Sequence, residues 1–295
     1  MKLTVLSIVI GIAAMLTVGC SEERKSTDEA LSLIDAAYKA KDYDKLLHLT
    51  DSLEKTGELL PSSANYWRGY ACDRTKRKQE AVEYWKAAIQ ESEKSTDAED
   101  LSNYVKAASH LSNILTLDKD YDGVLKLAQP VVERTEALKC DTTSDYANLL
   151  IYIGLCQITL GQSEGEENSR LLRACEKHQQ NIDRNHSDQA YKDAIAGMVN
   201  IAYYCVVSKK YEEALYYTRS FGDLLMEYEN HTGIDSIYVD RQVGRYTIYK
   251  ALALDNLGRK DEAGKTYEAF LQTKFSKSAE GIRFAEDYIK GNVSE

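Results

Sequence analysis

Two short stretches decide the fold: YWRGYA at residues 66–71 and EAVEYWKAAI at residues 80–89. Each has the apolar and small residues at intervals of three and four that are typical of an α-helix. The charged segment between them leaves room for little more than a turn. Gly69 in the first stretch and Ala81 in the second are small, and small residues let two helices approach closely. We therefore predict an antiparallel helix pair in which Gly69 faces Ala81.

Related stretches recur along the chain. Residues 201–217 and 251–270 repeat the pattern, with Ala214 and Ala263 in the place of Ala81. Strand-like alternation is nearly absent, so the sequence predicts an all-α fold. Self-similarity of this kind is typical of a helical solenoid.

The more degenerate copies extend the pattern over most of the chain. Counting them gives about six helix pairs between Asp28 and Gln272. We expect a final helix at 280–290, either as a cap or as the first helix of a further repeat.

The pattern resembles the tetratricopeptide repeat, a helix-turn-helix of about 34 residues. Gly69 matches the family's glycine in the first helix, Ala81 and Ala88 match the two small positions of the second, and Trp85 matches its large aromatic position. The resemblance implies a right-handed superhelical solenoid over residues 28–295. In such an array the first helices of the pairs line a concave face.

The resemblance also implies which side chains face a partner. Aromatic, asparagine and arginine side chains suit peptide binding, because they offer large contact areas and fork-shaped hydrogen-bond donors. We therefore expect a protein or peptide partner. The positions carried over from the family's groove are Tyr66, Tyr70, Arg74, Asn113, Asn148, Tyr203 and Arg245. The family members that grip a C-terminal carboxylate use a larger set of lysines, arginines and asparagines, of which only Asn113 has a counterpart here.

Composition and motifs narrow the function further. The chain has 295 residues and a net charge of -10, which disfavours nucleic-acid binding. No nucleophile, zinc-hydrolase or phosphate-loop motif is present, so we expect no enzyme activity, no cofactor and no small-molecule substrate. Cys175 and His178 are spaced as two metal ligands, but a metal site needs three or four. We therefore expect no metal site, with His178 and His186 in a polar surface segment at 179–189.

The N-terminus resembles that of a bacterial lipoprotein. Met1-Lys2 gives a positive start, an uncharged and mostly apolar run follows at 3–18, and Gly19 precedes Cys20. The resemblance implies cleavage before Cys20 and acylation of its side chain. Ser21 stands where aspartate favours inner-membrane retention in the family, so we expect an outer-membrane location in the cell envelope.

These expectations divide the chain into a signal peptide at 1–19, a lipid-anchored polar tether at 20–27 and a helical array at 28–295. A secreted protein with a cysteine at the cleavage point is the alternative reading of the N-terminus. The expected function is a lipid-anchored scaffold that binds a protein or peptide. The chain also resembles the extracytoplasmic sensor regions of some membrane histidine kinases. The main alternative is an outer-membrane assembly lipoprotein, and an enzyme of unknown type is the least favoured.

Overall fold

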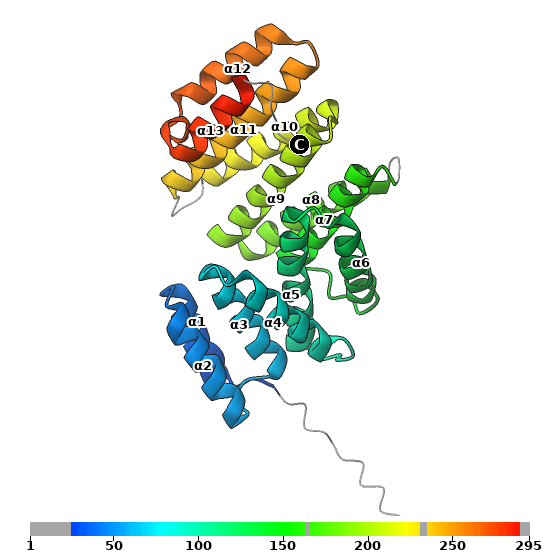
Figure 1. Ribbon diagram of the computed structural model, residues 1–295, viewed down its shortest axis with the longest axis vertical. Coiled ribbons are helices and arrows are strands. Elements are labelled where there is room, and N and C mark those ends of the chain that lie inside the picture. Colours follow the sequence, from blue (N-terminus) through cyan, green and yellow to red (C-terminus); the bar gives the residue numbers. More distant parts are fainter. Residues whose placement is uncertain (1–24, 163–165, 231–234, 290–295) are drawn as a thin grey trace, which may run out of the picture.

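The computed structural model of the protein describes residues 25–162, 166–230 and 235–289. These residues form α-helices joined by short turns, with one short 3₁₀ helix and no strand (Figure 1). In chain order the helices are α1 (Asp28–Lys39), α2 (Tyr43–Thr56), α3 (Pro61–Arg74), α4 (Lys78–Ser92), α5 (Ala98–Leu117), α6 (Tyr121–Ala137), α7 (Ser144–Leu160), α8 (Glu166–Asn185), α9 (Asp188–Val207), α10 (Tyr211–Glu229), α11 (Ser236–Asn256), α12 (Lys260–Gln272), η1 (Phe275–Lys277) and α13 (Ala279–Ile289). The predicted all-α class is confirmed. The helices α1 to α12 also cover the range predicted for six helix pairs.

The helices pack in chain order as successive hairpins. Each even-numbered helix in the described ranges packs mainly against its neighbours in the chain, and an ion pair between Arg173 and Glu136 also joins α8 to α6. The odd-numbered helices from α3 to α13 also contact one another in succession. They therefore form a continuous layer, and the even-numbered helices lie outside it. Buried apolar residues follow this layout in three clusters, one within α1–α3, one within α3–α5 and one from α5 to η1.

One turn geometry recurs between the helices of five pairs. The last residue before each N-cap has a positive φ, between 56° and 77°. The N-cap that follows has φ between -93° and -83° and ψ between 56° and 81°. Its backbone N–H donates to the carbonyl five residues earlier. The residues with positive φ are Lys41, Lys76, Lys119, Lys209 and Gly258. The repetition seen in the sequence is thus also a repetition of backbone conformation.

The helix pair α3–α4 shows why the small residues matter. Ala81 and Ala88 are fully buried, as predicted. The nearest atoms to Gly69 belong to the Trp85 indole ring, a contact that the sequence did not predict. A Cβ atom on Gly69 would lie 2.5 Å from both Cδ1 and Nε1 of Trp85. The glycine therefore makes room for a large ring that is 1% exposed.

The prediction that His178 lies on a polar surface is wrong. His178 is 1% exposed, whereas His186 is exposed as expected. The reason is its spacing on α8, which places it in line with the buried residues Leu171, Ala174 and Ile182. The polar residues around it in the sequence occupy the other faces of the same helix.

The five cysteines in the described ranges are all free thiols. Cys72, Cys156 and Cys205 are buried, and each lies in an apolar stretch of the sequence. Cys20, with the rest of the signal sequence, lies outside the described residues.

The start of the described chain is attached to the body of the molecule. The Ser26 hydroxyl donates to Oε1 of Glu99 on α5 and accepts a 3.0 Å hydrogen bond from the backbone N–H of Leu60. The backbone N–H of Thr27 donates to the carbonyl of Glu58 over 2.9 Å. These contacts attach the first described residues to α5 and to the segment between α2 and α3. In the part of the chain that the structure describes, no helix is both long and apolar enough to cross a bilayer.

Candidate functional site

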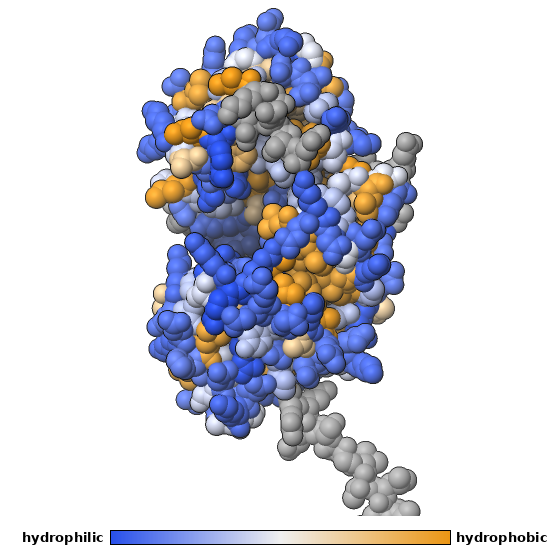
Figure 2. All heavy atoms as spheres, viewed as in Figure 1, coloured by the Kyte–Doolittle hydropathy of each residue, from blue (hydrophilic) through white to orange (hydrophobic). Residues whose placement is uncertain are grey.

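A cavity of about 610 Å³ lies on the layer of odd-numbered helices. Every residue that lines it comes from α1, α3, α5, α7 or α9, which are the first helices of five successive pairs. We call this cavity the groove. The molecular surface is hollowed between the region of α1 and α3 and the region of α9, and hydrophilic residues surround the hollow (Figure 2).

Five of the seven predicted partner-binding residues line the groove. Tyr66, Tyr70 and Arg74 come from α3, Asn113 comes from α5 and Asn148 comes from α7. They meet because the face that each first helix turns toward the groove repeats along the array. Whether these residues contact a ligand stays a prediction.

The other two predicted residues lie elsewhere. Tyr203, near the end of α9, packs against Tyr249 of α11, with the ring centroids 5.7 Å apart. Arg245 of α11 is ion-paired to Glu280 of α13, with 2.6 Å between Nη2 and Oε1. Neither side chain lines the groove.

Aromatic side chains form one wall of the groove. Tyr38 of α1 packs against Trp67 and Tyr70 of α3, with ring centroids 5.5 and 5.3 Å apart. Tyr66 packs edge-on against Trp67 at 5.1 Å. The Arg74 guanidinium lies over the Tyr70 ring at 4.9 Å, in cation–π geometry. Trp67 and Tyr70 are only half-buried, so the wall offers accessible apolar area next to a fixed cation.

His110 of α5 supports this wall. Its ring stacks on Trp85 with a centroid distance of 4.8 Å and an interplanar angle of 10°. The ring edge meets Tyr70 at 5.9 Å, and Nε2 lies 3.4 Å from the Tyr66 hydroxyl. Removal from water among these rings lowers the pKa of His110 to about 4. The imidazole is therefore neutral at physiological pH and acts as a packing and hydrogen-bonding group.

Carboxylates form the opposite wall. Asp145 at the start of α7 and Asp193 of α9 both line the groove. Burial, and to a smaller extent the nearby charge of Asp145, raise the pKa of Asp193 to about 6, against a hydrogen bond from Gln189. Burial also raises the pKa of Asp145, although Lys106 and Ser109 oppose the shift. Two carboxylates that each resist ionisation, side by side in a cavity, are typical of functional sites.

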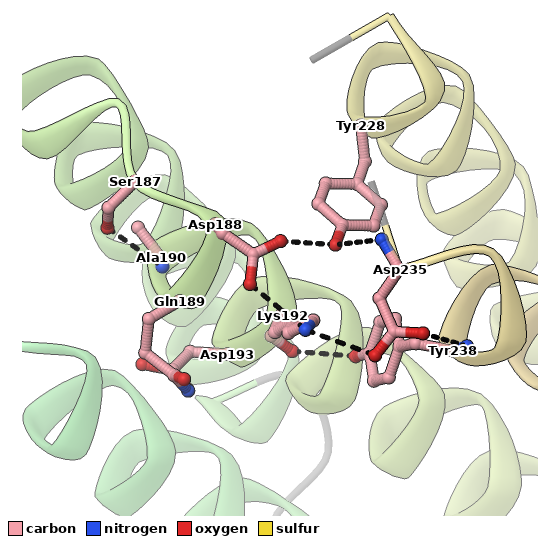
Figure 3. Close-up of polar contacts among 9 residues, drawn as sticks. All are labelled: Ser187, Asp188, Gln189, Ala190, Lys192, Asp193, Tyr228, Asp235 and Tyr238. Carbon is pink, nitrogen blue, oxygen red and sulfur yellow. Dashed lines mark hydrogen bonds and ion pairs between the residues drawn. The ribbon is translucent and has the colours of Figure 1, made fainter. Parts of the chain in front are cut away.

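A polar network holds the helix that carries Asp193. The Asp188 carboxylate accepts a hydrogen bond from the Tyr228 hydroxyl and pairs with Lys192 at 3.0 Å (Figure 3). The Lys192 ammonium also reaches Asp235 at 3.4 Å. The Tyr238 hydroxyl donates to the Lys192 carbonyl over 2.9 Å. These contacts tie the start of α9 to α10 and α11.

The same helix presents a second polar face to the groove. Gln189 and Asp193 point away from Tyr228 and Asp235, and the Gln189 amide donates to the Asp193 carboxylate over 2.7 Å (Figure 3). Neighbouring positions on a helix point about 100° apart. The contacts of Asp188 and Lys192 therefore hold the backbone of α9 in place, and with it the neighbouring residues Gln189 and Asp193 on the groove side. The groove carboxylate is therefore held on a rigid support.

The residues missed by sequence reasoning share a simple signal. Lys106 and His110 precede Asn113 on α5 by seven and three residues, and Asp145 precedes Asn148 on α7 by three. These spacings place them on the face of the predicted asparagines. Counting back along the helix by three or seven residues from Asn113 and Asn148 therefore identifies Lys106, His110 and Asp145. Asp193 has no such neighbour among the predicted residues.

A second cavity of about 500 Å³ lies between α10, α11 and α12. It contains none of the predicted residues. Among the described residues, no three His, Cys, Asp or Glu side chains are placed to hold a metal ion together. The groove is thus the stronger candidate for a binding site.

Comparison with known proteins adds no assignment. No protein-family model matches the chain, and no curated protein is similar enough in sequence to count as a relative.

Proposed function

We propose that the chain is a lipid-anchored scaffold of the cell envelope, built of tetratricopeptide-like pairs, which binds a protein or peptide segment in the groove. One observation carries the proposal: a single cavity takes all of its lining from the first helices of five successive pairs. A concave face lined by one helix from each repeat is how helical arrays bind extended partners. The proposed right-handed superhelix is supported by the contacts among odd-numbered helices and by the recurring turn.

The chemistry of the two walls indicates the kind of segment. Tyr38, Trp67 and Tyr70 offer flat apolar surface to an aromatic or aliphatic side chain. Asp145 and Asp193 offer negative charge, and a cation between them would stabilise the ionised form of Asp193 against the burial and the repulsion from Asp145 that raise its pKa. The proposed ligand is therefore a peptide that places a lysine, an arginine or a free amino terminus close to an apolar side chain.

The test uses synthetic peptides of this type and direct measurement of affinity. Replacing both carboxylates in Asp145→Asn/Asp193→Asn keeps the shapes of the side chains but removes their charge. A hydrogen bond to a charged group contributes about 1.5–3 kcal/mol, so we expect the double variant to bind cationic peptides at least tenfold more weakly, by about 1.4 kcal/mol or more. Asp44→Asn is the matched control, because Asp44 is exposed on α2, outside the groove.

The pH dependence provides a second readout. Asp193 is ionised above its pKa of about 6 and takes up a proton below it. Affinity for a cationic peptide should therefore be higher at pH 7.5 than at pH 5, while His110 stays neutral over the whole range. Equal affinity of the double variant and the unmodified protein, or an equal loss in Asp44→Asn, contradicts binding in the groove.

A further inference from the structure

A third cavity, of about 270 Å³, lies between α8, α9 and α10. Three of the side chains that line it carry donor atoms favoured by soft metal ions: the thiol of Cys175, the imidazole of His178 and the thioether of Met198. Cys175 and His178 are three residues apart on α8 and so share one face. Met198 comes from the facing helix α9.

His178 is the observation that calls for a ligand. Its side chain is 1% exposed, and neither Nδ1 nor Nε2 has a hydrogen-bond partner. The neutral imidazole has one nitrogen lone pair that is available to a metal ion. Its Nε2 edge lies so close to α9 that a Cβ atom on Gly197 would be 2.9 Å from Nε2. An imidazole left without partners in the interior is costly unless something binds to it.

The two sulfur atoms are already at a distance suited to a shared ligand. Sγ of Cys175 lies 3.5 Å from Sδ of Met198. Two sulfurs bound to one metal ion at ~2.3 Å, with an angle of ~110–120° between the bonds, lie about 3.8–4.0 Å apart, within about 0.5 Å of the distance found here. Little movement of either side chain is therefore needed. Cys175 is only half-buried, which leaves a route for an ion to enter.

We propose that Cys175, His178 and Met198 form a binding site for one Cu(I) ion. Thiolate and thioether ligands select Cu(I), and a thioether is unusual for zinc. Charge favours the same choice: one thiolate neutralises one monovalent ion, so the bound site carries no net charge into the interior. A divalent ion would need a second anion, and the Glu176 carboxylate, which also lines the cavity, is exposed to solvent.

Binding exchanges one proton for one metal ion. A thiol gives up its proton when its sulfur becomes a metal ligand. The thiol proton leaves to solvent as the Cu–S bond forms, and no electron is transferred. Affinity should therefore rise about tenfold for each unit of pH over the neutral range.

The test titrates the reduced full chain with Cu(I), without oxygen, in competition with a coloured Cu(I) chelator. The expected result is one equivalent of Cu(I) withheld from the chelator, with one proton released, and no Zn²⁺ withheld at the same free concentration. Cys175→Ser and Met198→Leu should each lower Cu(I) affinity at least tenfold. Leucine has nearly the volume of methionine, so Met198→Leu should keep its fold and isolates the thioether.

Matched controls come from the same chain. Cys140→Ser removes another partly exposed thiol, and Met226→Leu removes a methionine that is 58% exposed on α10. Both should bind Cu(I) as the unmodified protein does. X-ray absorption should find one nitrogen and two sulfur neighbours around the ion. Unchanged affinity in Met198→Leu, or an equal loss in Cys140→Ser, would overturn the site and leave only incidental binding to thiols.

Discussion

Gly69 shows how one absent side chain sets the distance between two helices. The indole of Trp85 lies where a Cβ atom would be, and that indole is itself fully enclosed. A close-packed interior gives such a ring little room to move. The hydrogen atom of Gly69 is therefore part of the fit between α3 and α4.

We expect Gly69→Ala to lower the free energy of unfolding by about 1–3 kcal/mol, because the added methyl group overpacks the Trp85 contact. Gly264→Ala is the control. Gly264 lies inside α12, and a Cβ atom there meets nothing within 4 Å. That change should instead stabilise the protein by about 0.5–1 kcal/mol, because alanine favours a helix. Urea unfolding of both variants measures the difference; losses of equal size would contradict the role given to Trp85.

Single residues also mark the limit of sequence reasoning. Small residues such as Ala81, Ala214 and Ala263 could be placed in the interior, and each is at most 1% exposed. The contact between Gly69 and Trp85 could not be predicted, because it depends on the orientation of the Trp85 side chain. His178 was misplaced since its sequence neighbours are polar, although its spacing from Ala174 and Ile182 points inward.

At the scale of elements, the turns between paired helices repeat one backbone conformation. Four of the five residues with positive φ in these turns are lysines, and only the fifth is glycine. A left-handed conformation strains any residue that has a Cβ atom. The four lysines therefore lower the stability of the fold by a small amount. The sequence alone does not show which lysines have this strained conformation, because that depends on the geometry of the turn.

We predict that Lys119→Gly raises the free energy of unfolding by about 1 kcal/mol, since glycine adopts the φ of 62° at this position without strain. Lys126→Gly is the matched control, for which we expect the opposite change in stability. Lys126 is exposed within α6, where glycine should destabilise by about 1 kcal/mol. Thermal unfolding of the two variants should shift in opposite directions. Destabilisation by both would show that the turn conformation is not strained.

Elements also explain how much of the groove could be predicted. First helices were identified from small residues, and this placed Tyr66, Asn113 and Asn148 on the correct face. Arg245 was predicted to line the groove but does not. It pairs instead with Glu280, because α13 packs on α11. The pairing of a terminal helix depends on the end of the array, which has no counterpart in the repeats. Asp145 and Asp193 gain their significance only from being close together in space.

At the scale of the whole molecule, the helices form two layers around a groove that draws on α1 to α9. Its aromatic wall and its carboxylates come from pairs distant in the sequence. A ligand that contacts both walls would therefore bridge the two halves of the chain and stabilise their relative placement.

The proposed anchor predicts how the protein is distributed between fractions of the cell. Cys20→Ser should move the protein from the membrane fraction to the soluble fraction, because acylation requires the cysteine side chain. Cys140→Ser should leave it with the membranes. Immunoblots of separated fractions measure both. If Cys20→Ser stays with the membranes, the N-terminus does not carry the proposed lipid.

The attachment of Ser26 to Glu99 and Leu60 sets a limit on reach. Cys20 lies six residues before Ser26, and a chain extends at most ~3.3–3.6 Å per residue. The two residues can therefore be at most about 20 Å apart. If Cys20 is acylated, Ser26 and the start of the helical body would therefore lie within about 20 Å of the lipid headgroups. If the proposed anchor is present, the groove would meet its proposed partner in the space next to that membrane.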